Sequence, residues 1–246
     1  MARRKCRLKA MVNEADPDLP PLHRHSVVHY QQRTDWDCGI SCVMMMLTRR
    51  QRQDFLRNFN RVCEEEGFGN STWTIDLCYL LRRFDIRHIY TTITVGVNPT
   101  FRNHDYYGPI LWKDHIRVSN KFDSATCDGL NIQKRTVDNR ILLKHLAENG
   151  PVIVLTNGYL LHCDLCKTKE SECLEEFRKC FSINKPKTKF SGHYIVLCGY
   201  DNRIGSVFYR NPAMDDHVCV MSYRKLTEAR TANGTDEDLI FVFRKS

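Results

Sequence analysis

The sequence lacks two features that would direct a chain to or through a membrane. No apolar run approaches the roughly 20 residues that a membrane-spanning helix needs. The N-terminal stretch MARRKCRLKAMVNEADPDLP is basic, but it has no apolar core and no small-residue cleavage site, so it is not typical of a secretory signal. We therefore expect a cytoplasmic or nuclear protein that has no membrane partner.

Signatures of nucleotide and nucleic-acid binding are also missing. The chain has no G-x-x-x-x-G-K-[ST] loop, no RNP-like motif and no helix-turn-helix pattern. Its formal net charge is +8, but the basic residues are scattered, as in Arg49-Arg50, Arg82-Arg83 and Lys134-Arg135, and they form no long stripe. Charge of this kind bears on solubility and non-specific contacts, so we do not expect nucleic acid to be the main partner.

What the chain does have is the composition of a folded domain. Hydrophobic residues make up 42% and charged residues 27% of the 246 residues, a length that can bury a sizeable core. No internal repeat is visible in the sequence. We expect residues 1–24 to form a flexible N-terminus and residues 25–246 to form a single domain.

Cysteine is abundant, with twelve residues in the chain. Because no secretory signal is evident, we expect thiols that are free, catalytic or metal-bound rather than paired in disulfides. Four of them, Cys163, Cys166, Cys173 and Cys180, fall in an insert at about 160–190 and could bind a structural zinc ion. The seven-residue gap between the last two is long for a zinc knuckle, so free thiols or regulatory oxidation remain open alternatives.

Hydrophobic periodicity predicts an α+β domain, with helices early in the chain and strands late. Apolar residues at helical spacing and capping residues predict helices over 38–50, 51–65, 76–84, 113–123, 138–148 and 222–230. Alternating or continuous apolar runs predict strands over 25–30, 86–97, 151–156, 193–200, 205–209 and 239–244. A helical half followed by an antiparallel-sheet half is therefore expected.

The stretch QQRTDWDCGISC places a cysteine, Cys38, where a helix should begin. A helix N-terminus stabilises the thiolate, which is the reactive form of cysteine. Gly39 allows close backbone approach of a substrate. Gln32 lies six residues upstream of Cys38, and its side-chain amide could stabilise an oxyanion together with the backbone N–H of Cys38.

A thiol nucleophile needs a base, and His193 is the best candidate because it opens an otherwise apolar strand in SGHYIVLCGYD. Asn211 ends the next strand, in FYRNPAM, and an antiparallel hairpin would bring it back beside His193. Taken alone, Cys38 is more often a buried small residue and His193 a hydrogen-bonded structural one. The ordered combination of Gln, Cys, His and Asn-Pro favours a catalytic set.

These residues, in this order, resemble the papain-like cysteine peptidases, and among them the bacteriocin-leader peptidases of the double-glycine type. The fuller set QQRTDWDCGISC, GHYIVLCGYD, YRNPA and GTDEDLIFVF resembles the guanylyl cyclase domain-containing protein family over about residues 25 to 246. The resemblance implies a papain-like fold with Cys38 as nucleophile, His193 as base, Asn211 as orienting residue and Gln32 in the oxyanion hole. The leader peptidases usually carry Asp where this chain has Asn211.

The resulting hypothesis is a thiol hydrolase that cleaves a peptide or amide bond in a peptide or protein substrate and needs no cofactor. One alternative is a guanylyl cyclase, which the family name implies and which would use Mg²⁺ or Mn²⁺. The acidic pairs Asp35/Asp37 and Asp215/Asp216 are present, but nothing in the sequence places them around a nucleotide. The other alternative is a peptidase fold that binds a peptide or partner without turnover.

Overall fold

The computed structural model describes residues 18–67, 69, 71–103, 106–166 and 190–244. Its centre is an eight-stranded sheet in the order β3-β2-β8-β4-β5-β6-β7, with β1 pairing to β5 beside this path. All pairings are antiparallel except β2 with β3. The strands are β1 Leu22–Arg24, β2 His88–Thr92, β3 Ile132–Lys134, β4 Val152–Asn157, β5 Gly192–Asp201, β6 Ser206–Arg210, β7 Cys219–Ser222 and β8 Leu239–Val242.

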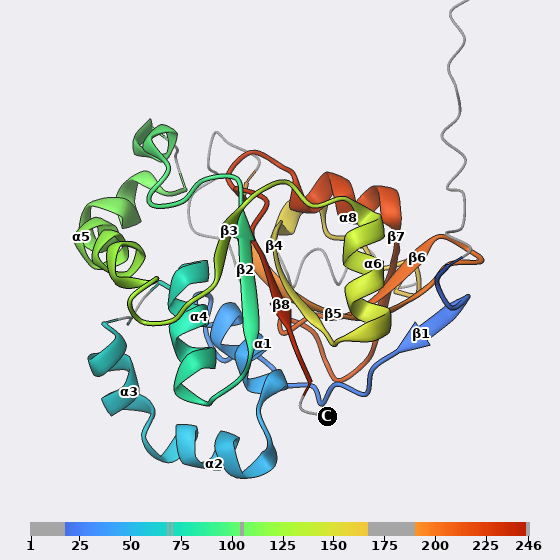
Figure 1. The fold of residues 1–246 in the computed structure, drawn as a ribbon, viewed down its shortest axis with the longest axis horizontal. Helices are drawn as coiled ribbons and strands as arrows, with labels where there is room; N and C mark the ends of the chain where they lie inside the picture. The colour runs from blue at the N-terminus through green and yellow to red at the C-terminus, as the bar shows by residue number, and fades with distance from the viewer. Residues whose placement is uncertain (1–17, 68, 70, 104–105, 167–189, 245–246) are drawn as a thin grey trace, which may run out of the picture.

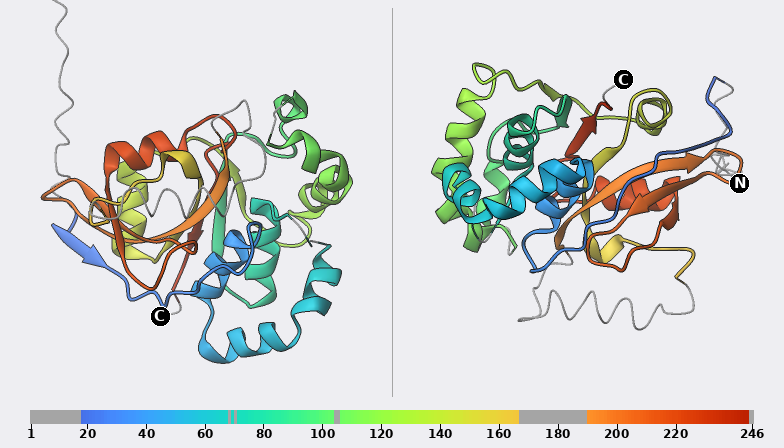
Figure 2. Two further views of the ribbon diagram at one scale, coloured as in Figure 1. Left: turned by 180° about the vertical axis from the view of Figure 1, so that it is seen from behind. Right: turned by 90° about the horizontal axis from the view of Figure 1, so that it is seen from below.

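Helices lie on both sides of this sheet (Figure 1). They are α1 Cys38–Met46, α2 Arg49–Arg57, α3 Phe59–Glu66, α4 Thr74–Arg83, α5 Gly108–Ser124, α6 Asn139–Glu148 and α8 Tyr223–Arg230, with short 3-10 turns η1 Pro99–Asn103 and η2 Gly158–Leu160. Seen from behind, α1 to α5 lie to one side of the strands and α6 with α8 to the other (Figure 2). No helix in the described part of the chain has both the length and the apolar character that a bilayer crossing requires.

Strand β4 shows why the sheet is covered on both faces. All of its residues are buried, and successive side chains alternate between two cores. Ile153 and Leu155 pack with α1 and α4, whereas Val152 and Val154 pack with α6 and α8. A strand buried on both faces must be apolar throughout, which explains the continuous run in the sequence.

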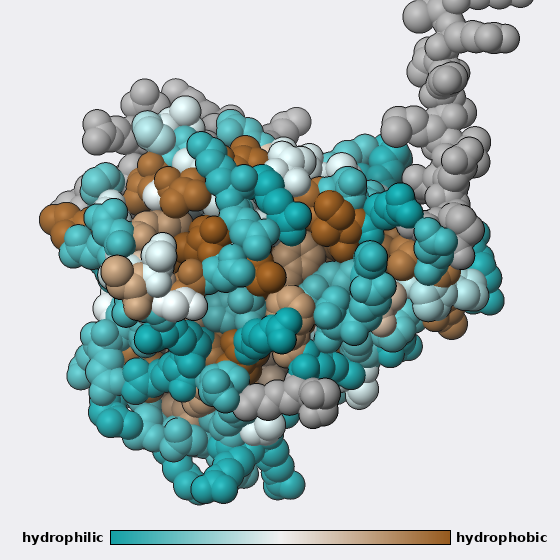
Figure 3. All heavy atoms as spheres, in the orientation of Figure 1, coloured by the Kyte–Doolittle hydropathy of each residue, from teal (hydrophilic) through white to brown (hydrophobic). Residues whose placement is uncertain are grey.

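The charged helices α2 and α3 lie away from the sheet. In α2 only Phe55 is buried, and in α3 only Val62. The corresponding region of the surface, at the bottom of Figure 3, is hydrophilic. These two helices therefore add little to the core, and we place no functional residue on them.

The predicted α+β, papain-like arrangement is confirmed, since a helix that begins with Cys38 packs against a sheet that carries His193. The strands over 151–156, 193–200, 205–209 and 239–244 are confirmed to within two residues. Helix α6 is confirmed with its cap, because the Asp138 carboxylate accepts the Ile141 N–H at 2.8 Å.

Other predictions were wrong in position or extent. The first strand is Leu22–Arg24 and not 25–30, so the sheet begins before residue 25. The backbone of this strand passes close above Gly199, where a side chain would lie 2.3 Å from the His23 carbonyl. The strand expected over 86–97 is only His88–Thr92, and with β3 it extends the sheet from the helical half.

Candidate functional site

The loop before Cys38 is shaped by Asp37. Its backbone carbonyl accepts the Ser41 N–H at 2.9 Å and so begins helix α1. Its carboxylate does not cap the helix but accepts the backbone N–H groups of Arg33 and Thr34, at 3.1 and 3.0 Å. The acidic residue before the cysteine therefore folds the polar loop that leads to it.

Cys38 is the first residue of α1 and is 5% exposed. Burial raises the pKa of its thiol to about 11, and the nearby Asp37 charge acts in the same direction. The backbone amide of Tyr194 donates to the sulfur and acts in the opposite direction. Because Tyr194 follows His193 in β5, the sulfur lies against the backbone of the strand that carries the histidine.

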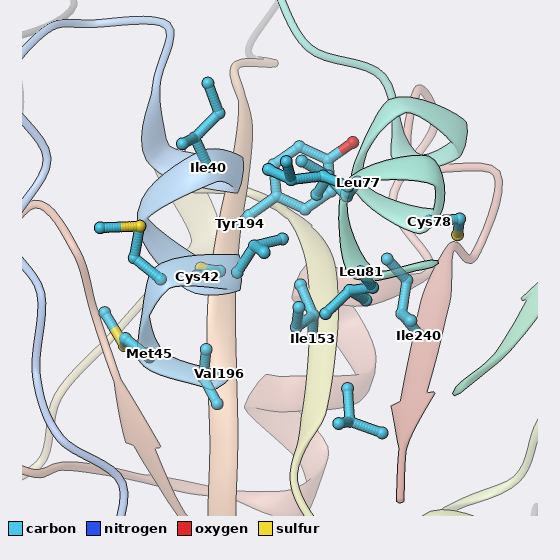
Figure 4. Packing of buried hydrophobic residues seen from close by; sticks show 14 of the residues in the cluster. Ile40, Cys42, Met45, Leu77, Cys78, Leu81, Ile153, Tyr194, Val196 and Ile240 are labelled. Atoms are coloured by element: carbon cyan, nitrogen blue, oxygen red, sulfur yellow. The ribbon is translucent and has the colours of Figure 1, made fainter. Parts of the chain in front are cut away.

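Gly39 is required for packing, and its predicted role in substrate approach stays a prediction. A side chain there would lie 2.9 Å from Leu77 and 3.0 Å from the Tyr194 ring. The absence of a side chain lets α1 approach α4 and β5 closely, and Figure 4 shows Tyr194 between the two helices. Gly39 is therefore required by the core beneath the nucleophile.

The His193–Asn211 pair is formed as predicted, with Nε2 of His193 2.8 Å from Oδ1 of Asn211. Asn211 follows β6, which pairs with β5, and its side chain reaches back along the hairpin. The Ala213 backbone N–H donates to the same Oδ1 at 3.0 Å. Of the two polar atoms of the Asn211 side chain only the oxygen can accept from an amide, and that oxygen has no hydrogen to donate, so the imidazole Nε2 must be the donor. Neutral His193 then carries its lone pair on Nδ1, the form that can act as a base.

Burial disfavours the charged forms of Cys38 and His193. His193 is fully buried, and burial lowers its pKa to about 4, with the Asn211 hydrogen bond acting in the opposite direction. The pKa of Cys38 moves the other way, to about 11. Both shifts favour a neutral thiol and a neutral imidazole at pH 7, because burial disfavours charge. A thiolate–imidazolium pair as the active nucleophile stays a prediction.

Gln32 lies in the loop held by Asp37 and bonds to the segment that carries Asn211. Its backbone N–H donates to the Pro212 carbonyl at 2.8 Å. Its side-chain amide nitrogen donates to the Thr34 carbonyl at 2.8 Å, which uses one of its two hydrogens. The second hydrogen is available in principle to an oxyanion, and that role stays a prediction.

A buried chain of hydroxyl groups anchors Tyr194, and sequence reasoning missed it. The Thr74 hydroxyl donates to the carboxylate of Asp238, and its oxygen lies 2.9 Å from the Tyr194 hydroxyl. Since Thr74 has one hydrogen to give, Tyr194 must be the donor in the second bond. Burial raises the pKa of Asp238 to about 7. Nothing in the sequence around the tail motif TDEDL indicated this link.

Tyr106 packs against the start of the strand that carries His193. Its hydroxyl lies 3.4 Å from the Gly192 carbonyl, and its ring contacts Phe190 edge-on at 5.3 Å between centroids. Burial raises its pKa, and the Cys38 charge adds to that rise. The sequence gave no sign of this position.

Replacing Tyr106 by Ala is expected to speed alkylation of Cys38 by about tenfold. Partial rehydration of the site should lower the raised pKa of the Cys38 thiol by about one unit, and each unit increases the reactive thiolate fraction about tenfold. The measurement is site-resolved peptide mapping after brief iodoacetamide treatment at pH 8. The variant Tyr106→Phe keeps the ring and should label at the wild-type rate. Equal rates in all three proteins would show that another group closes the site.

The acidic pairs weighed for a cyclase do not form a metal site in the described structure. The Asp37 carboxylate is engaged by backbone amides, and Asp35 beside it is exposed. Asp216 pairs with Arg210 at 2.7 Å, and Asp215 is exposed. Among described residues, the group close enough to share an ion is made of cysteines. The Mg²⁺ or Mn²⁺ chemistry of a cyclase therefore has no fitting carboxylate set in this part of the chain.

The predicted zinc ligands divide into two pairs. Cys173 and Cys180 lie outside the described residues. Cys163 and Cys166 follow η2 and are half-buried. Their sulfurs lie close to that of Cys219, a residue that sequence reasoning did not consider.

Comparison with known proteins shows the family to which the chain belongs. A family model described as guanylylate cyclase matches residues 27–242. Guanylyl cyclase 1 of Arabidopsis thaliana is 31% identical over 228 residues, which are 92% of this chain and 79% of that protein. A solved structure from Bacillus anthracis, described as a C39-like peptidase, matches with a TM-score of 0.48 and 15% identity, covering 92% of this chain and 98% of that one. The family match extends over nearly all of the sheet and over Cys38, His193 and Asn211, and the chain belongs to the guanylylate cyclase family.

Proposed function

We propose that the protein is a thiol hydrolase that cleaves a peptide or amide bond, with a peptide or protein as substrate. Cys38 is the nucleophile, His193 the base and Asn211 the residue that positions His193. The observation that supports this best is the 2.8 Å bond from His193 Nε2 to Asn211 Oδ1, whose direction the Ala213 amide fixes. A histidine held in this tautomer presents a basic Nδ1.

The chemistry follows from these roles. The Cys38 sulfur attacks the substrate carbonyl carbon while its proton passes to Nδ1 of His193. The imidazolium is stabilised by Asn211, and the oxyanion by the Cys38 amide and Gln32. Nδ1 then protonates the leaving amine as the C–N bond breaks, which leaves a thioester. Water, deprotonated by His193, cleaves the thioester and restores the thiol.

Burial of the site sets a condition on this mechanism. With a Cys38 pKa of about 11 and a His193 pKa of about 4, the resting thiol is a poor nucleophile. A substrate has to displace the Tyr106 side chain before the substrate carbonyl can reach the Cys38 sulfur. Proton transfer is then favoured only as the oxyanion forms, so free thiolate should not accumulate. Such a site limits reaction with unrelated electrophiles.

A guanylyl cyclase is the second candidate, and the family match together with the name of the Arabidopsis relative favours it. Against it stands the absence, among described residues, of a carboxylate cluster that could hold two metal ions. A cyclase also has no use for a histidine positioned by Asn211. A non-catalytic peptide-binding protein is the third candidate, but it too leaves the His193–Asn211 bond without a role.

One experiment separates the candidates. Wild type, Cys38→Ala and Cys42→Ala are each incubated with a proteome-derived peptide library, and new peptide termini are identified by mass spectrometry. We expect cleavage by wild type and Cys42→Ala and none by Cys38→Ala, because Cys42 is a buried cysteine of the same helix. Each protein is also assayed for cyclic GMP from GTP with Mg²⁺ or Mn²⁺. Cyclic GMP production that survives Cys38→Ala, without peptide cleavage, would overturn the hydrolase proposal.

A further inference from the structure

Three cysteines and a histidine converge away from Cys38. The sulfurs of Cys163, Cys166 and Cys219 lie within 4.8 Å of one another. Nε2 of His217 lies 3.4 Å from the sulfur of Cys166 and 3.2 Å from that of Cys219. The four side chains come from two segments, one following η2 and the other leading into β7.

The sulfur separations and the two His217 contacts are close to those around a tetrahedral metal ion, but His217 is not within 4.8 Å of all three sulfurs, so its ring has to move toward Cys163 when an ion binds. Zinc–sulfur bonds of about 2.3 Å and zinc–nitrogen bonds of about 2.0 Å place neighbouring ligand atoms roughly 3.5 to 3.8 Å apart. The two His217 contacts are within a few tenths of an ångström of that range, and the spread of the sulfurs encloses it. Cys163 and Cys219 are not joined in a disulfide, which would need sulfurs about 2.05 Å apart.

The backbone holds the four side chains in place. Cys163-x-x-Cys166 has the spacing of a zinc knuckle, and the Asp164 N–H donates to the Val220 carbonyl at 2.7 Å, so this turn is fixed to β7. The backbone amides of Val220 and Leu165 also donate to the Cys163 sulfur, as expected around a thiolate ligand. His217 lies at a bend two residues before Cys219, the first residue of β7, and its Nε2 lies 3.2 Å from the Cys219 sulfur.

We propose that Cys163, Cys166, His217 and Cys219 bind one Zn²⁺ ion in a structural Cys₃His site. Three thiolates with one imidazole select zinc over the harder divalent cations. Four protein ligands leave no open position, so the ion serves structure rather than catalysis. This set replaces Cys173 and Cys180 of the sequence-based hypothesis with two residues that lie more than fifty positions away from Cys163.

The site would also brace the segment that carries Asn211. Only five residues separate Asn211 from His217, and this segment bonds to the loop before α1 at two points. The Pro212 carbonyl accepts the Gln32 N–H at 2.8 Å, and the Met214 carbonyl lies 2.9 Å from Nε2 of His29. A bound ion fixes the far end of the same segment. The inference stands whether or not the protein proves to be a hydrolase.

The test is metal content and cobalt spectroscopy of the full chain, purified under reducing conditions without a metal-affinity tag. We expect about one zinc per chain by elemental mass spectrometry. Replacement by Co²⁺ should give the visible absorption of a tetrahedral thiolate site. His217→Ala should weaken zinc binding by about 100-fold or more, since even outer partners of ligands are worth 10- to 100-fold. Cys127→Ser, at an exposed cysteine, and the double variant Cys173→Ser/Cys180→Ser should retain the ion.

Two results would overturn the proposal. One is wild-type protein that holds no zinc and shows no tetrahedral cobalt spectrum. The other is loss of the ion from the Cys173/Cys180 double variant with retention in Cys219→Ser. Both wild-type measurements decide the matter even where a ligand variant fails to fold.

Discussion

Replacing Asp238 by Asn is expected to stabilise the protein above pH 7 by about 4 kcal/mol relative to its effect near pH 4. The Asp238 carboxyl is buried, and its pKa rises from an ordinary 3.8 to about 7. Each pKa unit is equivalent to 1.36 kcal/mol, so a shift of about three units means that folding favours the protonated over the ionised carboxyl by about 4 kcal/mol. The Asn side chain imitates the protonated acid and cannot ionise.

The sign follows from proton binding. Between pH 4 and 7 the folded protein keeps the Asp238 proton that the unfolded chain has already released. Wild-type stability from this group is therefore fully present below about pH 4 and is lost as the pH rises through 7. Buried histidines such as His25 and His193, each with a pKa lowered to about 4, contribute in the opposite direction over much of the same range. Only the difference between variant and wild type isolates Asp238.

The measurement is urea unfolding of wild type and Asp238→Asn at intervals from pH 4.5 to 8.5. The matched control is Asp216→Asn, at a side chain that is 72% exposed, and it should follow the wild-type curve at every pH. A constant difference between Asp238→Asn and wild type would mean that the carboxyl ionises normally in the folded state. The Thr74–Asp238 bond would then be the only contribution of this residue.

Those parts of the site that depend on local pattern could be predicted from the sequence. Cys38 precedes an apolar block and therefore begins a helix, and His193 opens an apolar run and therefore begins a strand. Asn211 could be placed because the strand that precedes it is a hairpin neighbour of the strand that His193 opens. Each of these inferences needs only periodicity and short-range topology.

The electrostatic state of the site could not be predicted in the same way. Cys38 and His193 are both buried, and the neighbours of this site come from distant segments. Tyr106, which lies 3.4 Å from the Gly192 carbonyl, comes from a segment almost ninety residues away from His193 and has no periodic pattern around it. The chain from Asp238 through Thr74 to Tyr194 likewise joins positions 164 and 120 residues apart in sequence. Such contacts arise only when the two halves pack together. The burial of Cys38 and His193, which disfavours the charged form of each, could therefore not be predicted from the sequence.

The proposed zinc site also draws on residues outside the cysteine insert. H-V-C at 217–219 offers two ligands, and its Cys219 is the first residue of strand β7. Sequence distance hid the relation, because β4 to β7 must first form before Cys219 meets Cys163. A ligand set drawn from two distant segments is common for metal sites in folded domains.

The second large effect is expected at His193. The variant His193→Ala should lower kcat/KM for peptide cleavage by about 10³-fold, near the middle of the range for loss of a general base and equal to about 4 kcal/mol. Wild-type kcat/KM should fall as the pH drops through about 4, because protonated His193 cannot accept the Cys38 proton. The matched control is His88→Ala, at a half-buried histidine of β2 whose Nδ1 bonds only to the nearby Ile86 carbonyl among described contacts.

Asn211→Asp gives the sharper version of the same test. A carboxylate oxygen can still accept from His193 Nε2 and from the Ala213 amide, so the geometry is kept while a negative charge is added. That charge stabilises the imidazolium and should raise the pKa of His193 by one unit or more. The acid limb of the pH–rate profile should then move upward together with the His193 titration followed by NMR. If the His193 titration moves but the acid limb of the pH–rate profile does not, His193 is not the base. If the His193 titration does not move, the hydrogen bond between His193 and residue 211 does not form in solution.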